Sequence, residues 1–117
     1  MEVTLFQKNN GCFCWISVND FKGGVSEQYK VKGLEKGDVL TGYISYPLKN
    51  PKKAMFRWDE NRFKLCEQIC DYYRRIYEEE EQSPGLYGIW GHGIEDLVIE
   101  QIRVDTDNKL IKLSIGS

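Results

Sequence analysis

The hydrophobic positions of residues 59–82 repeat with the period of an α-helix. Apolar side chains recur every three or four residues, at Phe63, Cys66, Ile69, Cys70, Tyr73, Ile76 and Tyr77. This spacing places them on one face of a helix. Asp59 suits the N-cap position, where a carboxylate accepts hydrogen bonds from free first-turn amides. The Ser-Pro-Gly sequence at residues 83–85 ends the pattern. We therefore expect one long helix over about residues 59–82.

The rest of the chain alternates in the manner of β-strands separated by turns. We expect strands at residues 2–7, 12–18, 25–31, 38–46, 54–58, 95–104 and 109–115. The Asn-Asn-Gly turn at residues 9–11 predicts that the first two strands form a hairpin, and the glycine-rich residues 86–93 suit an irregular segment. The sequence thus predicts a single α+β domain over residues 1–117. Its mostly antiparallel sheet has about five to seven strands, with the helix packed on one face.

Composition excludes several classes of protein. A chain of 117 residues can bury roughly two-thirds of its unfolded surface, so it needs no metal or disulfide to fold. No stretch approaches 18 apolar residues, which predicts no membrane span. The first ten residues lack the basic start and apolar run of a signal peptide. We therefore expect a cytoplasmic protein.

Charge is distributed unevenly along the chain, although the net charge is only −2. Between Phe21 and Lys64 there are ten Lys and Arg residues against five Asp and Glu residues. Between Asp71 and Asp107 there are three Lys and Arg residues against ten Asp and Glu residues. Such blocks bear on partners and association rates rather than on fold. Folding could also bring the two blocks together and cancel them.

Four consecutive glutamates, Glu78–Glu81, fall at the C-terminal end of the predicted helix. The helix dipole makes acidic residues there unfavourable by a few tenths of a kcal/mol each, roughly. This indicates a role outside stability, and acidic side chains beside tyrosines suit a basic protein partner. The alternative is a solvated helix end. The predicted contact residues are Asp71, Tyr77, Glu78, Glu79, Glu80, Glu81, Trp90, Glu95 and Asp96.

The four cysteines form two pairs, Cys12 with Cys14 and Cys66 with Cys70. Each pair lies on one side of its predicted element, so four thiolates could converge on zinc. Neither spacing matches the common zinc modules, however, and free cysteine is among the most buried residue types. We expect core cysteines and no metal site.

Two further hypotheses concern catalysis and nucleic-acid binding. His92, the single histidine, could act as a general base oriented by Glu95 or Asp96, although bracing a glycine turn is the favoured interpretation. Residues 49–58 mix lysines with Phe56 and Trp58, a combination that can bind single-stranded nucleic acid. Core aromatics and a solvated loop are the alternative there. No phosphate-binding glycine motif is present, and no cofactor is expected.

A family resemblance is found in the last part of the chain. The residues that carry it are the segment Tyr87-Gly-Ile-Trp-Gly-His-Gly-Ile-Glu-Asp-Leu-Val-Ile-Glu and the strand at residues 109–116. It resembles the C-terminal part of small bacterial immunity proteins, which accompany polymorphic or contact-dependent toxins. This implies a small cytosolic α+β protein without catalytic activity. Such a protein neutralises one cognate toxin domain by covering its active site or a nearby surface. The family's binding residues vary, so the resemblance implies no particular contact residue here.

The sequence thus favours a non-catalytic interaction protein that inhibits a toxin, with a basic nuclease as the expected partner class. It predicts binding through the acidic, aromatic surface around the helix end. An enzyme based on His92 and a single-strand binding module at residues 49–58 stay open as alternatives.

Overall fold

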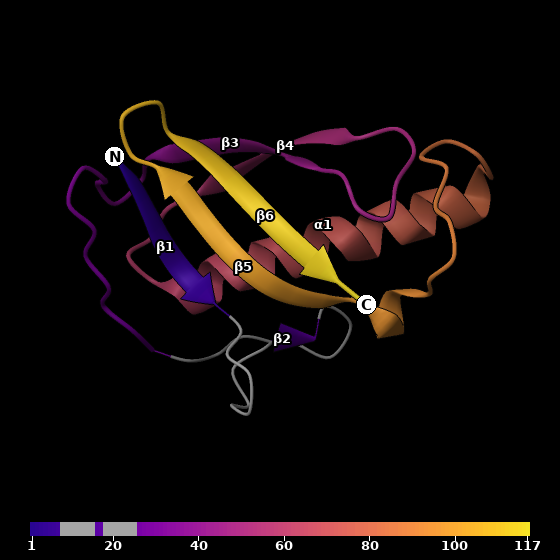
Figure 1. Cartoon of the computed structure of the whole chain (residues 1–117), viewed down its shortest axis with the longest axis horizontal. Coiled ribbons are helices and arrows are strands. Elements are labelled where there is room, and N and C mark those ends of the chain that lie inside the picture. The colour runs from indigo at the N-terminus through magenta and orange to yellow at the C-terminus, as the bar shows by residue number, and fades with distance from the viewer. Residues whose placement is uncertain (8–15, 18–25) are drawn as a thin grey trace.

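The computed structural model describes residues 1–7, 16–17 and 26–117, with the backbone alone at residues 16–17. Its elements are β1 (Glu2–Gln7), β2 (Ile16–Ser17), β3 (Val39–Ile44), β4 (Lys52–Arg57), α1 (Arg62–Gln82), the 3-10 turn η1 (Ile94–Asp96), β5 (Val98–Asp105) and β6 (Leu110–Gly116). The strands form one sheet in the order β1-β5-β6-β3-β4, with β2 paired to β5. Helix α1 lies behind this sheet in Figure 1. The expected α+β fold, a mostly antiparallel sheet with one long helix on it, is confirmed.

The pairing of the strands differs from the expected N-terminal hairpin. Strand β1 pairs with residues 101–105 of β5, and β2 pairs with residues 98–99 of the same strand. The two strands therefore follow one another along β5 instead of pairing with each other. The expected turn at residues 9–11 lies outside the described residues. Strand β5 also begins later than expected, at Val98, because residues 94–96 form the turn η1.

The parallel pair β3 and β6 joins the two halves of the sheet. Thr41 lies opposite Leu110, and the Thr41 amide donates to the carbonyl of Lys109 at 3.0 Å. Gly42 makes this approach possible, since a Cβ there would lie 2.4 Å from the carbonyl oxygen of Ile111. A side chain at residue 42 would thus push the two strands apart.

The core lies between α1 and the inner face of the sheet. Six helix residues are buried, namely Leu65, Cys66, Ile69, Cys70, Tyr73 and Ile76. Leu40 and Phe56 of the sheet, together with Ile102, are almost completely buried in the same cluster. Five of the seven stripe residues are thus buried as expected, while Phe63 and Tyr77 are half-buried. Among the described residues, no helix combines the length and the apolarity that a membrane crossing requires.

The N-terminus of α1 corrects the expected cap. Asn61, not Asp59, is the N-cap, and its side-chain oxygen accepts hydrogen bonds from the amides of Phe63 and Lys64 at 2.9 and 3.0 Å. Asp59 instead approaches two cations, Arg57 and Lys64, at 3.8 and 3.5 Å. The helix therefore begins at Arg62, two to three residues later than expected.

Residues 26–31 have the side-chain alternation of a strand but do not form one. Glu27 and Tyr29 are half-buried and Val31 is buried, whereas the residues between them are exposed. The segment is held by the helix N-terminus: Glu27 pairs with Arg62, whose guanidinium also lies 4.2 Å from the Tyr29 ring. The expected strand at residues 25–31 is therefore wrong over its described part, because the alternation reflects packing against α1. Val25 lies outside the described residues.

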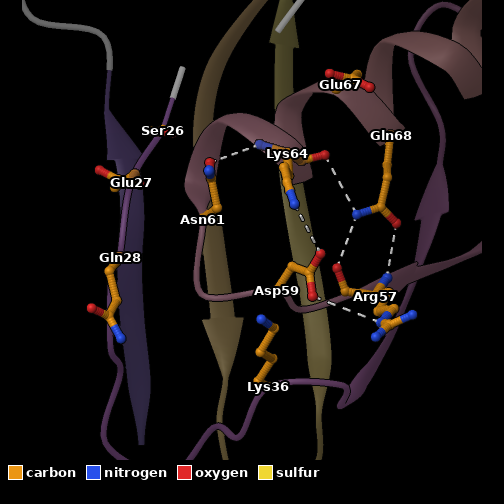
Figure 2. A pocket seen from close by; sticks show the side chains of 10 residues that line it. All are labelled: Ser26, Glu27, Gln28, Lys36, Arg57, Asp59, Asn61, Lys64, Glu67 and Gln68. Carbon is orange, nitrogen blue, oxygen red and sulfur yellow. Dashed lines mark hydrogen bonds and ion pairs between the residues drawn. The ribbon is translucent and has the colours of Figure 1, made fainter. Parts of the chain in front are cut away.

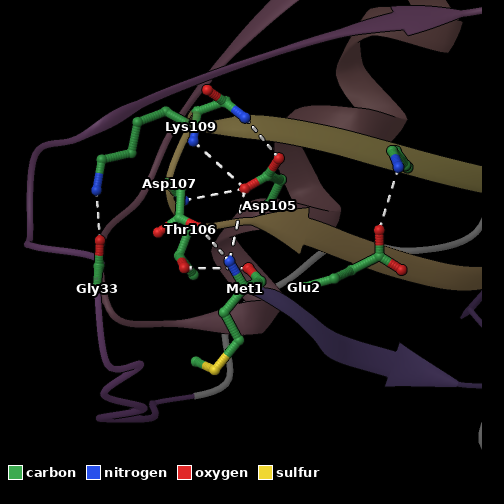
Figure 3. Close-up of polar contacts among 9 residues, drawn as sticks. Met1, Glu2, Gly33, Asp105, Thr106, Asp107 and Lys109 are labelled. Carbon is green, nitrogen blue, oxygen red and sulfur yellow. Dashed lines mark hydrogen bonds and ion pairs between the residues drawn. The ribbon is translucent and has the colours of Figure 1, made fainter.

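The turn between β5 and β6 is organised by Asp105 (Figure 3). Its carboxylate accepts hydrogen bonds from the amide of Asp107 at 3.0 Å and from the side chain of Asn108 at 2.9 Å. Beside the turn, the Met1 amine pairs with Asp107, and the Lys109 ammonium donates to the carbonyl of Gly33. The C-terminal hairpin predicted from the sequence is confirmed.

Two side chains of α1 cover the outer edge of β4. The Tyr72 hydroxyl accepts from the amide of Met55 at 3.1 Å and donates to its carbonyl at 3.2 Å. The Gln68 side chain accepts from the amide of Arg57 and donates to its carbonyl, both at 2.9 Å. Unpaired groups on an edge strand can recruit another strand. Gln68 and Tyr72 occupy these groups at two positions of β4.

Candidate partner-binding site

The glutamates at the end of α1 face in different directions and make different contacts. Glu80 turns towards the loop that follows the helix, and its carboxylate accepts from the amides of Gly85 and Tyr87 at 2.8 and 2.7 Å. These amides hold the pKa of Glu80 below its ordinary value. Glu79 accepts from the Tyr87 hydroxyl at 2.8 Å. Two of the four glutamates thus bind the loop, a stabilising role that was not predicted from the sequence for this pair.

A hollow of about 590 Å³ opens between the end of α1, the following loop and η1. We call it the acidic groove. It is lined by Arg74, Tyr77, Glu78, Glu80, Glu81, Ile89, Gly93, Ile94 and Glu95. Most of these residues come from three elements that are separate in the sequence, so the groove exists only because the loop folds back along the helix.

The acidic groove carries an excess of negative charge. Four carboxylates line it against one guanidinium, that of Arg74, which is itself bound to Asp71 at 2.7 Å. Glu78, Glu81 and Glu95 are exposed, so their charges are available to a partner. A concave surface lined by one sign of charge attracts partners of the opposite sign and accelerates their encounter.

Tyr77 forms the link between the helix and the loop within the groove. It is half-buried, and its hydroxyl donates to the carbonyl of His92 at 3.0 Å. Burial, with the added negative charge of Glu95 and Asp96, raises the pKa of Tyr77 to about 12. The half-buried side chains of Ile89 and Ile94 supply apolar surface beside it. The groove therefore combines an acidic rim with an aromatic and aliphatic lining.

The remaining predicted contact residues do not line this groove. Asp71 reaches it only through its ion pair with Arg74. Asp96 is exposed beside Glu95 in η1. Glu79 lines a different hollow, and Trp90 packs edge-on against Tyr46 with ring centroids 5.6 Å apart. The structure thus brings Tyr77, Glu78, Glu80, Glu81 and Glu95 together in the groove lining, which does not include the other four.

Sequence reasoning missed the residues that shape the groove. Arg74 precedes Glu78 by one helical turn, a spacing at which side chains meet, so the sequence held a signal for it. Ile89 and Ile94 gave no such signal, because their positions depend on the fold of a glycine-rich loop. In that loop Gly88 and Gly91 have φ values of 69° and 74°, which favour glycine.

His92 has aromatic and hydroxyl neighbours. Its Nε2 lies 3.3 Å from the Ser117 hydroxyl, and its ring lies 5.8 Å from that of Tyr46 and 6.1 Å from that of Trp90. Among the described residues, neither Glu95 nor Asp96 is hydrogen-bonded to the His92 ring through its carboxylate. The arrangement expected for an oriented general base is therefore not formed by the described contacts.

The described cysteines are core residues. Cys66 and Cys70 are buried with free thiols, and burial raises the pKa of each to about 12. A metal ion binds the thiolate, so a raised thiol pKa disfavours coordination. Within residues 1–7 and 26–117, no group of three or more potential ligands is placed to hold a metal ion. Cys12 and Cys14 lie outside the described residues.

The aromatics of residues 49–58 do not suit base stacking. Phe56 and Trp58 are 1% and 0% exposed, so they are core aromatics, as the alternative interpretation held, and the hypothesis that they stack on nucleic acid is wrong. Lys52 and Lys53 line a hollow together with Glu78 and Glu79. The basic and acidic blocks of the sequence therefore meet at this side of the helix end.

A larger hollow, of about 910 Å³, lies near the N-terminus of α1 (Figure 2). Its charged lining residues are Glu27, Lys36, Arg57, Asp59, Lys64 and Glu67. Three cations and three carboxylates balance each other, and Figure 2 shows Asp59 between Arg57 and Lys64. Because it has no excess of either charge, this hollow is a weaker candidate than the acidic groove.

Comparison with known proteins adds no functional assignment: no family model, curated protein or solved structure matches this chain.

Proposed function

We propose that this chain is a non-catalytic, cytoplasmic interaction protein that binds a basic protein partner through the acidic groove. The observation that carries the proposal is the groove's lining of four carboxylates against one guanidinium, with Tyr77, Ile89 and Ile94 beside them. Complementary charge gives fast and specific association. Aromatic and aliphatic contacts supply affinity that charge alone does not.

The partner class follows from the resemblance of residues 87–116 to small bacterial immunity proteins. On that basis the partner is a toxin domain whose activity this chain blocks, with a basic nuclease as the class best matched by the groove's charge. A nuclease presents cations where it holds phosphates. An acidic groove can occupy those cations in place of the nucleic-acid backbone.

The test is a pull-down from the source organism with three tagged proteins: the wild type, Glu78→Lys/Glu81→Lys, and Glu35→Lys/Glu67→Lys. The first variant reverses two groove charges, and the second makes the same change of charge away from the groove. We expect the wild type and the second variant to retain one basic protein in nearly equal amount. The first variant should release the basic protein at a lower salt concentration than the wild type does.

Two outcomes contradict the proposal. Equal retention of the basic protein by both variants would show that the groove is not the contact surface. Recovery of no basic partner at any salt concentration would contradict the proposed interaction and favour the alternative of an enzyme that uses His92.

A further inference from the structure

The outer face of the sheet, which points away from α1, carries an apolar patch. Strand β3 presents Val39, Thr41 and Tyr43 at alternate positions, the adjacent strands contribute Met55 and Leu110, and the buried residues Leu40 and Ile44 point to the core. The patch consists of Val39, Thr41, Tyr43, Met55 and Leu110. Its four large apolar side chains are 42–59% exposed. Exposed apolar surface of this kind marks an interaction site when it is contiguous.

The strand register shows that the patch is contiguous. Thr41 lies opposite Met55 on one side and opposite Leu110 on the other. Val39 and Tyr43 stand two residues either side of Thr41, on the same face. Side chains directly opposite one another on adjacent strands are about 5 Å apart. The five residues therefore form a cross centred on Thr41, which we call the sheet patch.

Cations flank the sheet patch along β4. Lys53 lies opposite Tyr43, and Arg57 lies opposite Val39. Both are exposed, and the Arg57 Nε lies 3.8 Å from the carboxylate of Asp59. Strand β4 thus presents lysine, methionine and arginine in alternation on this face.

The acidic groups near the sheet patch are already engaged. Asp105 lies opposite Leu110 but accepts hydrogen bonds within the β5–β6 turn. Glu2 binds Lys112 and Arg103, each at 3.1 Å, on the neighbouring part of the face. Lys53 and Arg57 are exposed on this face, although Lys53 also lines a hollow with Glu78 and Glu79, and Arg57 also lies beside Asp59.

We propose that the sheet patch binds an acidic, apolar segment of a protein partner. Its apolar side chains cover Thr41, Met55 and Leu110, and its carboxylates pair with Lys53 and Arg57. The patch is a second interaction surface, of opposite charge to the acidic groove and built from other elements. The two cations are four positions apart along an extended strand, a span of about 13 Å. Carboxylates about two turns apart on a helix match that span.

Two features favour this occupant and this mode of docking. Gln68 and Tyr72 already occupy backbone groups on the edge of β4, so the segment lies on the face and does not extend the sheet. Single-stranded nucleic acid is less well matched, since stacking needs several exposed rings and Tyr43 is the one aromatic in the patch. A symmetric dimer through the patch would bring like charges into one interface.

The test is selection of peptides of about 16 residues, roughly four helical turns, from a random displayed library on the whole protein. Peptides retained by the wild type but not by Tyr43→Ser/Met55→Ser report the sheet patch. We expect these peptides to be acidic and apolar. In fluorescence anisotropy with the synthetic peptides, Lys53→Glu should weaken binding by about tenfold or more. Lys32→Glu and Leu86→Ser, matched exposed changes elsewhere, should leave binding unchanged.

Each other outcome overturns the proposal. Patch-dependent peptides that are basic or neutral would contradict the charge argument, and their absence would contradict the patch. Tighter binding of single-stranded oligothymidine, lost in the same variants, would assign the face to nucleic acid. A dimer in analytical ultracentrifugation that Tyr43→Ser/Met55→Ser dissociates would assign it to a second copy. A groove variant that leaves the hollow of Lys53 and Glu78 unchanged, Glu81→Lys/Glu95→Lys, should bind the selected peptides normally, which separates this test from that of the acidic groove.

Discussion

At the residue scale, the acidic end of α1 shows how one sequence feature can serve two purposes. The carboxylate of Glu80 binds two amides of the following loop, whereas those of Glu78 and Glu81 remain available to a partner. The unfavourable position of the four charges at a helix C-terminus is offset in part by these hydrogen bonds. Under the proposed function, loop stabilisation and partner binding are therefore combined in four consecutive residues.

Replacing Glu80 by Ala should loosen the loop, whereas replacing Glu81 by Ala should not. We expect faster hydrogen exchange at the amides of Gly85 and Tyr87, measured by NMR, because both lose their acceptor. The pKa of Glu80 is lowered in the fold, so its stabilising effect is present above its ordinary pKa of 4.5 and disappears as the pH falls through the folded-state value. Equal exchange rates in the two variants would contradict this role.

The buried thiols predict a loss of stability in alkaline solution. Cys66 and Cys70 keep their protons in the fold up to a pKa of about 12, whereas unfolded thiols ionise near 9. Stability from this difference is complete below pH 9 and is lost as the pH rises towards 12. At pH 10 each thiol should reduce the free energy of unfolding by about 1 kcal/mol.

Urea unfolding at pH 8 and pH 10 measures this effect, in a Cys12→Ser/Cys14→Ser background. As a control, Cys70→Ala in that background should show a smaller decrease. Rapid labelling of the two helical thiols in the native protein, or a decrease no smaller in the control, would show that they are not buried as described.

At the element scale, α1 both fills the core and closes the edge of β4. The sequence predicted the first of these roles, because the apolar stripe is read directly from residues 63–77. The second could not be predicted, since Gln68 and Tyr72 are ordinary surface residues until β4 lies beside them. Residues 26–31 could not be assigned from the sequence for the same reason. Their side chains alternate between buried and exposed as in a strand, but the segment packs against Arg62 at the start of α1 and does not pair with another strand.

Removing the edge cover should expose β4 to other chains. We expect Gln68→Ala/Tyr72→Phe to lower the free energy of unfolding by about 1–3 kcal/mol, because hydrogen bonds to two edge residues are lost. It should also increase self-association, measured by light scattering. Glu67→Ala, an adjacent change on the same helix, serves as the control. An unchanged free energy of unfolding with no gain in association would contradict the shielding role.

At the scale of the whole molecule, the basic and acidic blocks of the sequence do not form two separate surfaces in the fold. Lys52 and Lys53 meet Glu78 and Glu79 at one side of the helix end, so part of the two blocks cancels. Glu81 and Glu95 of the acidic groove and Arg57 beside the sheet patch lie outside this shared hollow. The sequence predicted the acidic residues of the groove but not its apolar lining by Ile89 and Ile94. These two residues line the groove because of the path of the preceding loop, which depends on hydrogen bonds to Glu80 and on glycines.

The central claim is that the acidic groove steers a basic partner into contact. The most direct test is the association rate constant of the protein recovered in the pull-down, measured against ionic strength for the wild type, Glu78→Lys/Glu81→Lys and Glu35→Lys/Glu67→Lys. We predict a rate constant that falls steeply with salt for the wild type and the second variant. For the groove variant it should be lower by about tenfold or more at low salt. Equal rate constants for all three proteins would contradict the account.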